Sequence, residues 1–183
     1  MVATPENNAE HNMEIRDAVA EDIEAIAKVY LASLLTAYAE IATEDYLSTR
    51  NLSDCISQWT YNIHDDSVTV VVAESNGVIE GVASFGMARD ADVDRNRTAE
   101  LQAIYVSPDR WASGVGRRIC AQVMGRIYSG RFSSILLWVL SDNARAIRFY
   151  ERAGFKSDGT SKTVKMGHEL LATRYRHSSQ QRS

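Results

Sequence analysis

The stretch from Ile104 to Gly116 reads IYVSPDRWASGVG, and a helical pattern follows it at once. It begins as an apolar strand, breaks at Pro108 and ends in a loop whose glycines open the helix. Gly114 and Gly116 lack a Cβ, so a bound group can come close to their N–H groups. A helix N-terminus adds unpaired N–H donors and a partial positive charge, so the loop predicts a phosphate or pyrophosphate site.

Two familiar phosphate-binding loops do not fit this sequence. The loop of nucleoside triphosphatases requires a lysine with serine or threonine after the second glycine, and Gly116 is followed by arginines. A dinucleotide-binding fingerprint needs a third glycine and an acidic residue about twenty positions further on, and both are missing. Taken alone, the pattern fits a plain strand-to-helix connection equally well, because glycines also ease a turn.

Composition narrows the class of protein. The 183 residues have the length of a single domain with a proper core. A net charge of −4, without any lysine- or arginine-rich block, argues against a nucleic-acid binder. The polar start and the lack of a long apolar run predict a cytoplasmic protein that does not engage membranes. Cys55 and Cys120 have no metal-type spacing, so we expect buried, reduced thiols and no metal.

Apolar periodicity predicts one mixed α/β domain over 13–176, between polar tails at 1–12 and 177–183. Predicted helices cover 20–39, 43–63 with Thr43 as N-cap, the segment after Gly116, and 142–153 capped by Ser141. Predicted strands cover 13–17, 68–73, 78–87, 99–106, 134–140, 155–162 and 169–176. The expected fold is a central mixed sheet of about seven strands flanked by four helices.

Three further segments carry a resemblance to a known family. They are AELQAIYVSP at 99–108, LLWV at 136–139 and NARAIRFYERAGF at 143–155, in that order around the glycine loop. Over about Val68 to Phe155 the chain resembles the GNAT superfamily of N-acetyltransferases. The resemblance implies a single GNAT-type domain that uses acetyl-CoA as co-substrate.

The resemblance also implies where acetyl-CoA binds. In the family, the pattern Gln/Arg-x-x-Gly-x-Gly/Ala holds the pyrophosphate through its backbone amides. The matching residues here are Trp111, Ala112, Ser113, Gly114, Val115, Gly116 and Arg117. Trp111 departs from the pattern: the backbone donor stays, but the usual side-chain contact is lost, and Arg110 or Arg117 are the residues that could replace it.

Two more segments belong to the coenzyme site that the family implies. Main-chain groups of the strand before the loop, at Ile104, Tyr105 and Val106, would pair with the pantetheine arm like an added strand. Asn143 matches the asparagine that family members place near that arm. Its position also suits an ordinary first-turn residue of the following helix.

Acetyl transfer to an amine needs three kinds of catalytic group. A base or a water chain must take a proton from the amine, the oxyanion needs a donor, and the leaving thiolate needs a proton. Tyr150 matches the family's tyrosine that acts as general acid to the thiolate, against the alternative of a core aromatic residue. Glu100 occupies the position of the glutamate base in histone-acetylating members, against an exposed strand glutamate. Trp138 stands where the ribosomal-protein alanine N-acetyltransferases carry a glutamate base, which argues against their mechanism.

The function predicted from these residues is transfer of the acetyl group of acetyl-CoA to a primary amine of a small molecule, by direct attack in a ternary complex. The first 63 residues would form much of the acceptor wall, with aromatic side chains at Tyr38, Tyr46, Trp59 and Tyr61. The N-terminal helices and a homodimer partner could close such a site. The alternatives are a protein or peptide amine as acceptor, which needs an open groove, and a non-catalytic acyl-CoA-binding or sensing module.

Overall fold

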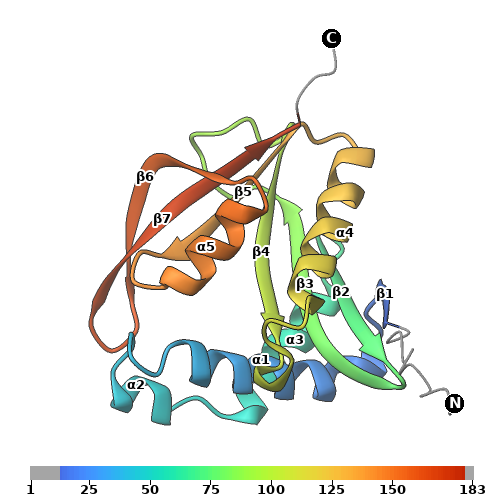
Figure 1. Cartoon of the computed structure of the whole chain (residues 1–183), viewed down its shortest axis with the longest axis vertical. Coiled ribbons are helices and arrows are strands. Elements are labelled where there is room, and N and C mark those ends of the chain that lie inside the picture. Colours follow the sequence, from blue (N-terminus) through green and yellow to red (C-terminus); the bar gives the residue numbers. More distant parts are fainter. Residues whose placement is uncertain (1–12, 180–183) are drawn as a thin grey trace, which may run out of the picture.

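The computed structural model describes residues 13–179 as one seven-stranded sheet with helices on both faces (Figure 1). The strands are β1 (Met13–Asp17), β2 (Val68–Ser75), β3 (Val78–Met87), β4 (Thr98–Val106), β5 (Ser134–Leu140), β6 (Lys156–Lys165) and β7 (Glu169–Ser178). They lie in the order β1-β2-β3-β4-β5-β7-β6. Every neighbouring pair is antiparallel except β4 and β5, so the sheet is mixed, as predicted.

Five α-helices lie in the described residues, and four of them have nine or more residues, in agreement with the four expected. They are α1 (Ile23–Ala37), α2 (Glu44–Ser48), α3 (Leu52–His64), α4 (Val115–Ser129) and α5 (Ala144–Arg152). Short 3₁₀ turns cover Ala20–Asp22 and Pro108–Arg110.

The two faces of the sheet bury separate cores. Helices α4 and α5 pack on one face, around Ile119, Leu137 and their neighbours. Helices α1 and α3 pack on the other face, around Ile26 and Trp59. Successive strand residues point to opposite faces, and both faces of β2 are covered. This explains why β2 reads as a nearly continuous apolar run.

The predicted helix at 43–63 is two helices. Thr43 is the N-cap of the first, as expected, because its side chain accepts from the Tyr46 N–H at 3.2 Å. The second begins after Asn51, whose side chain accepts from the Asp54 N–H at 3.0 Å. An asparagine cap starts a new helix, so the apolar periodicity that continues across Asn51 concealed the break.

The last predicted helix also begins later than expected. Asn143 is its N-cap, with the side chain accepting from the Ala146 N–H at 3.0 Å. Ser141, the predicted cap, instead shares a hydrogen bond of 2.8 Å with Thr173 on β7. Serine and asparagine can both cap a helix. Because the Ser141 hydroxyl is bonded to Thr173, Asn143 caps α5 instead.

The predicted tail at 177–183 needs a correction at its start. β7 continues to Ser178, and the Tyr128 hydroxyl lies 2.6 Å from Nδ1 of His177. Strand pairing with β5 therefore extends beyond the expected end of the domain at residue 176. The predicted tail at 1–12 and the rest of the C-terminal one, from residue 180, lie outside the described residues.

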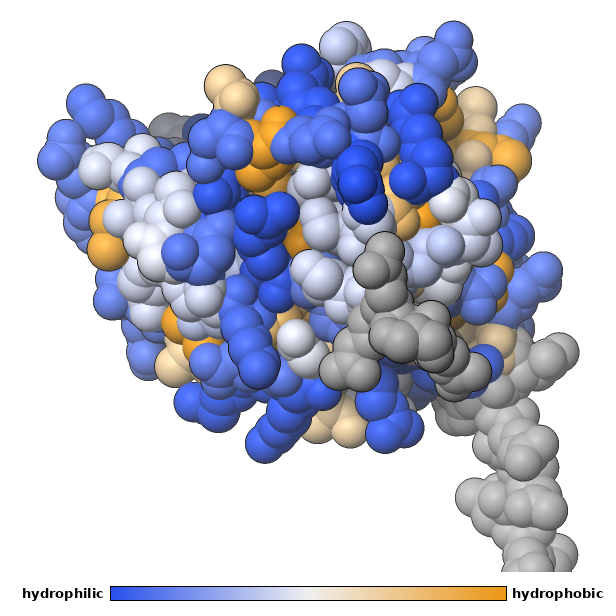
Figure 2. All heavy atoms as spheres, turned by 90° about the horizontal axis from the view of Figure 1, so that it is seen from above, coloured by the Kyte–Doolittle hydropathy of each residue, from blue (hydrophilic) through white to orange (hydrophobic). Residues whose placement is uncertain are grey.

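The surface is largely polar, and the two cysteines lie in the interior. The face beside the end of β7 is largely hydrophilic, with apolar atoms only in scattered spots (Figure 2). Within 13–179, no helix is both long and apolar enough to cross a membrane. Cys55 and Cys120 are buried and free, as predicted.

Candidate active site

The parallel strands β4 and β5 pair only briefly and then part. Their register covers three residue pairs, from Thr98 with Ser134 to Glu100 with Leu136. β5 remains paired with β7 as far as Leu140, so it keeps its place in the sheet while β4 turns away. The two strands form a wedge that opens toward α1 and the glycine loop (Figure 1). From Leu101 to Val106, the edge of β4 that faces β5 has no strand partner.

The direction of the β4 main chain shows which groups face this split. The Ser107 N–H donates to the Glu80 carbonyl of β3 at 2.8 Å. Main-chain groups of successive residues point to alternate sides of a strand, so Val106 and Ile104 direct N–H and C=O into the split. Tyr105 lies between them and directs its own main-chain groups toward β3. The split therefore offers two residues to an extended, amide-containing ligand.

The glycine loop lies at the open end of this edge and has an unusual backbone. Gly114 is the N-cap of α4 with φ of 96°, and Ala112 also has a positive φ, 62°. Left-handed residues within a turn bring successive N–H groups into a concave anion-binding arrangement. The first N–H groups of α4 have no partner within the helix and add to it. Gly114 thus has the unusual backbone for which a glycine is suited, whereas Gly116 lies within α4 and has no positive φ.

Trp111, the departure from the family pattern, has a definite place in the structure. Its indole Nε1–H donates to the Val106 carbonyl at 2.7 Å, on the open edge of β4. The Arg145 guanidinium of α5 lies 3.4 Å from the centre of the Trp111 ring. Trp111 therefore connects the end of β4 to the first turn of α5, which a glutamine would do less well because it has no ring for Arg145 to stack on.

Arg110, one of the two proposed substitutes for the missing side-chain contact, is engaged elsewhere. It forms an ion pair of 2.8 Å with Glu80, whose side chain is about nine-tenths buried. Glu80 is the extra residue of a β-bulge in β3, opposite Ala73 and Glu74. The pair anchors the Pro108–Arg110 turn to β3. Arg117, on the exposed start of α4, is the substitute that stays available.

Tyr150 lies on α5 and packs against the core beneath α4. Its ring makes edge contacts with Phe149 at 5.1 Å and Phe155 at 5.9 Å between centroids. Burial raises the pKa of the Tyr150 hydroxyl well above its usual range, and the neighbouring Cys120 and Tyr38 groups raise it further. The hydroxyl stays protonated at neutral pH, which is the form that a general acid needs.

Tyrosines from α1 and β4 lie close together on the face of the sheet opposite to Tyr150. Tyr30 and Tyr105 meet edge to face, with ring centroids 4.7 Å apart. Burial raises the pKa of Tyr30 to about 12, and it also raises the pKa values of Tyr38 and Tyr105. Of the predicted acceptor aromatics, Tyr38 lies here, Trp59 is in the core with 1% exposure, and Tyr61 is 69% exposed.

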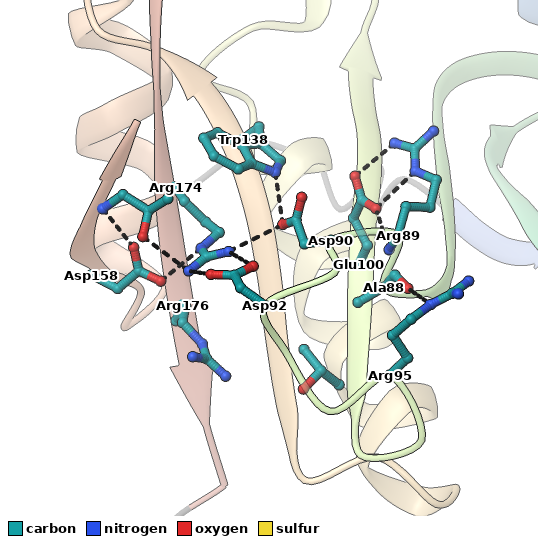
Figure 3. A network of polar contacts seen from close by, with 12 residues as sticks. Ala88, Arg89, Asp90, Asp92, Arg95, Glu100, Trp138, Asp158, Arg174 and Arg176 are labelled. Carbon is teal, nitrogen blue, oxygen red and sulfur yellow. Dashed lines mark hydrogen bonds and ion pairs between the residues drawn. The ribbon is translucent and has the colours of Figure 1, made fainter. Parts of the chain in front are cut away.

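Glu100 lies at the narrow end of the split, where the last β4–β5 pair is formed. It is buried, and both carboxylate oxygens accept hydrogen bonds from Arg89, at 2.8 Å to Oε2 and 2.6 Å to Oε1 (Figure 3). The hydrogen bonds to Glu100 raise the pKa of Arg89. The predicted alternative of an exposed strand glutamate is wrong, since Glu100 is 4% exposed.

A second group of charges beside the split was not found by sequence reasoning. Arg174 of β7 binds Asp90 and Asp92 of the β3–β4 loop and Asp158 of β6, and Asp90 also accepts from the Trp138 indole at 3.1 Å (Figure 3). We call these five residues the Arg174 cluster. The only sequence signal was the density of charges at 89–97, which predicted a loop but no partner for it.

An open strand edge, an anion-binding loop at its end and a half-buried phenol beside it suit a thioester coenzyme with a phosphate end and an amide-containing arm. The fold and this site define an acyl-CoA-dependent transferase. The model of the acetyltransferase (GNAT) family matches residues 31–155. The chain belongs to this family and is an acetyl-CoA-dependent N-acetyltransferase.

Individual relatives agree with this assignment. An uncharacterized N-acetyltransferase, YuaI of Bacillus subtilis, is 34% identical over 137 residues, 75% of this chain and 76% of that protein. The L-amino acid N-acyltransferase MnaT of Escherichia coli is 29% identical over 143 residues, 78% of this chain and 79% of MnaT. The structure of yncA, a putative acetyltransferase from Salmonella typhimurium with its cofactor acetyl-CoA, superposes with a TM-score of 0.70. It is 25% identical and covers 94% of this chain and 96% of yncA.

The glycine loop can be tested by a matched pair of substitutions. Gly114→Ala adds a Cβ that meets no atom within 4 Å, so its cost comes from the left-handed backbone alone. We expect it to lower the free energy of unfolding by about 1–2 kcal/mol and to weaken acetyl-CoA binding as the loop shifts. Gly125→Ala, within α4 and equally free of clashes, should leave the Kd unchanged. Urea denaturation and calorimetric titration measure both quantities, and an unaltered Kd in Gly114→Ala would contradict the assignment of the loop.

Proposed function

We propose that this enzyme acetylates the primary amine of a small molecule, by direct attack of the amine on acetyl-CoA in a ternary complex. The observation that carries the proposal is a contact between two segments beside the end of β5. The Thr43 N–H, between α1 and α2, donates to the Met166 carbonyl at the tip of the β6–β7 hairpin at 3.3 Å. A polypeptide acceptor needs a groove that continues past the reacting amine, and this contact supports a site that does not continue between the two segments.

Side chains also pack closely where the α1–α2 segment meets the β6–β7 hairpin. A Cβ on Gly167 would lie 1.7 Å from Oγ1 of Thr43, so only glycine permits this approach of the hairpin. Tyr38 and Ile41 from the end of α1 pack with Leu140 and Leu170 in a small apolar cluster beneath it. The relative MnaT is an L-amino acid N-acyltransferase, which supports a free amino acid or a similar compound as the class of acceptor.

The proposed coenzyme contacts follow the geometry of the split. The pantetheine arm would lie along β4 and pair with Ile104 and Val106, with its pyrophosphate at the Trp111–Arg117 loop. Asn143 uses its side-chain oxygen to cap α5, which leaves its Nδ2 group to donate to the arm. The amine then attacks the thioester carbonyl carbon, the C–S bond breaks, and the CoA sulfur takes a proton from Tyr150.

Glu100 is proposed to accept the proton of the amine through a water chain. Direct transfer is disfavoured by the geometry, because both oxygens already accept from Arg89 and the side chain is 5% exposed. A homodimer and a cytoplasmic location stay predictions from the sequence.

The acceptor class is tested by an acetyl-CoA consumption screen over amino acids, polyamines, aminoglycosides and short peptides. We expect turnover with one or more small amines, amino acids foremost, and little with peptides. Preferential turnover of peptides would contradict the small-molecule proposal. Binding of acetyl-CoA, seen as a raised Tm, without turnover of any amine would instead favour the sensing module.

The role of Tyr150 is tested by Tyr150→Phe, which keeps the ring and removes the acid. We expect kcat to fall about 10²–10⁴-fold while the Kd for acetyl-CoA changes little. Tyr128→Phe is the control, because Tyr128 is another half-buried tyrosine whose hydroxyl contacts His177, at the end of α4 opposite to the glycine loop. Equal losses in the two variants would remove Tyr150 from the acid role.

The role of Glu100 is tested by Glu100→Gln and a pH profile of kcat/KM. Without its base the enzyme depends on amine that is already neutral, so we expect the loss of rate to be greatest at low pH. Glu80→Gln, a second buried glutamate paired with an arginine, should keep the wild-type shape of the profile. A wild-type profile in Glu100→Gln would exclude Glu100 as the base.

A further inference from the structure

The β3–β4 loop bridges the split at its narrow end. Consecutive loop residues hold different strands: Arg89 pairs with Glu100 on β4, and Asp90 accepts from the Trp138 indole of β5 (Figure 3). Trp138 lies two residues beyond Leu136, the last β5 residue to pair with β4, and on the same face as Leu136. The bridge therefore crosses the split just where the strands have begun to part.

The bridge lies on the face from which an acceptor must approach. Ile135, Leu137 and Val139 of β5 point to the core under α4 and α5, on the Tyr150 side. Trp138 and Leu140 point to the opposite face, where they pack with Tyr38 at the end of α1. With the coenzyme arm in the split and α4 and α5 behind it, the amine has only the α1 face left.

Arg174 is what holds the loop in this position. Its side chain is 5% exposed and makes ion pairs of 2.7 Å with Asp92 and 3.4 Å with Asp90 on the loop. Asp158 of β6 accepts from Nε at 2.7 Å and orients the guanidinium from the other side. The hydrogen bonds with Asp92, and then those with Asp158, raise the pKa of Arg174, so the cation is retained at any physiological pH.

A gain in folding stability is a poor explanation for placing Arg174 among three carboxylates. One buried arginine cannot neutralise three carboxylates, and buried ion pairs are on average no more stabilising than apolar packing of the same volume. Such networks do fix one geometry among several, and the geometry fixed here is the position of the β3–β4 loop over the split.

We propose that the Arg174 cluster is a specificity-determining strap that closes the narrow end of the acceptor site and excludes acceptors whose chain continues past the reacting amine. Together with the Thr43–Met166 contact, it would limit the acceptor to a compact amine. The inference rests on the proposed small-molecule function and names the residues that enforce it.

The test releases the strap in two ways. Trp138→Phe keeps an aromatic ring but removes the indole N–H that donates to Asp90. Asp92→Asn weakens the ion pair between Arg174 and the loop. For each variant, kcat/KM is measured with trialanine and with the small amine that the wild-type enzyme acetylates fastest. We expect the trialanine-to-small-amine ratio to rise about tenfold or more in both variants.

Asp22→Asn is the matched control, since it takes the same kind of carboxylate from a different arginine, Arg16, beside the opposite edge of the sheet. Its ratio should stay at the wild-type value. The Asp92 side chain is 59% exposed, so Asp92→Asn carries the test if Trp138→Phe does not fold.

Three results would overturn the proposal. An unchanged ratio in folded Asp92→Asn, in an enzyme that prefers small amines, contradicts the strap and leaves the proposed function standing. An equal rise in Asp22→Asn shows that losing any carboxylate–arginine pair changes the ratio through stability in general. A wild-type enzyme that acetylates trialanine as fast as any small amine contradicts both proposals at once.

Discussion

The parting of β4 from β5 is the constraint on which the rest of the site depends. A sheet loses main-chain hydrogen bonds wherever neighbouring strands separate, so such a gap persists only where other contacts hold both strands in place. Here β5 is held by its full pairing with β7, and β4 by its pairing with β3. The helices pack on the two faces of the sheet on either side of the gap. What remains is an edge of main chain that can take an extended coenzyme arm.

Pairs of charged residues hold the segments at the two ends of this gap. The Glu80–Arg110 pair anchors the turn that leads into the glycine loop. The Arg89–Glu100 pair and the Arg174 cluster hold the β3–β4 loop at the opposite end of β4. In each place an arginine from one segment meets a carboxylate from another, and the pair is at least partly shielded from solvent. Such pairs contribute little net stability, but they fix the relative positions of segments that share no hydrogen-bonded ladder.

Local patterns in the sequence were enough to predict the α/β class, the strands and the conformation of the glycine loop. Turn residues and alternation act within a few positions, so Gly114 could be placed before any tertiary contact was known. The break at Asn51 was missed because the apolar spacing of α2 and α3 continues across it. The N-cap at Asn143 was missed because Ser141 is an equally good cap until Thr173 engages it.

The partners of charged residues could not be predicted in the same way. Glu100 was identified by its position before the loop, yet Arg89 lies 11 residues away and Arg174 meets Asp92 across 82 residues. Nothing in the local pattern of β7 distinguishes Arg174 from the less buried Arg176 two residues further on. Pairing across such distances is a property of the sheet order, in which β7 enters between β5 and β6.

The indole bond of Trp111 to Val106 has a consequence for self-association. Unpaired strand edges are templates for pairing with other chains, and proteins that keep one must protect it. In this enzyme the end of the open edge is occupied by the chain's own side chain, with a cation from α5 stacked above it. An arm that pairs with β4 as a strand would have to share or displace that bond at Val106. The residue that departs from the family pattern thus covers the end of an edge with which another strand could otherwise pair.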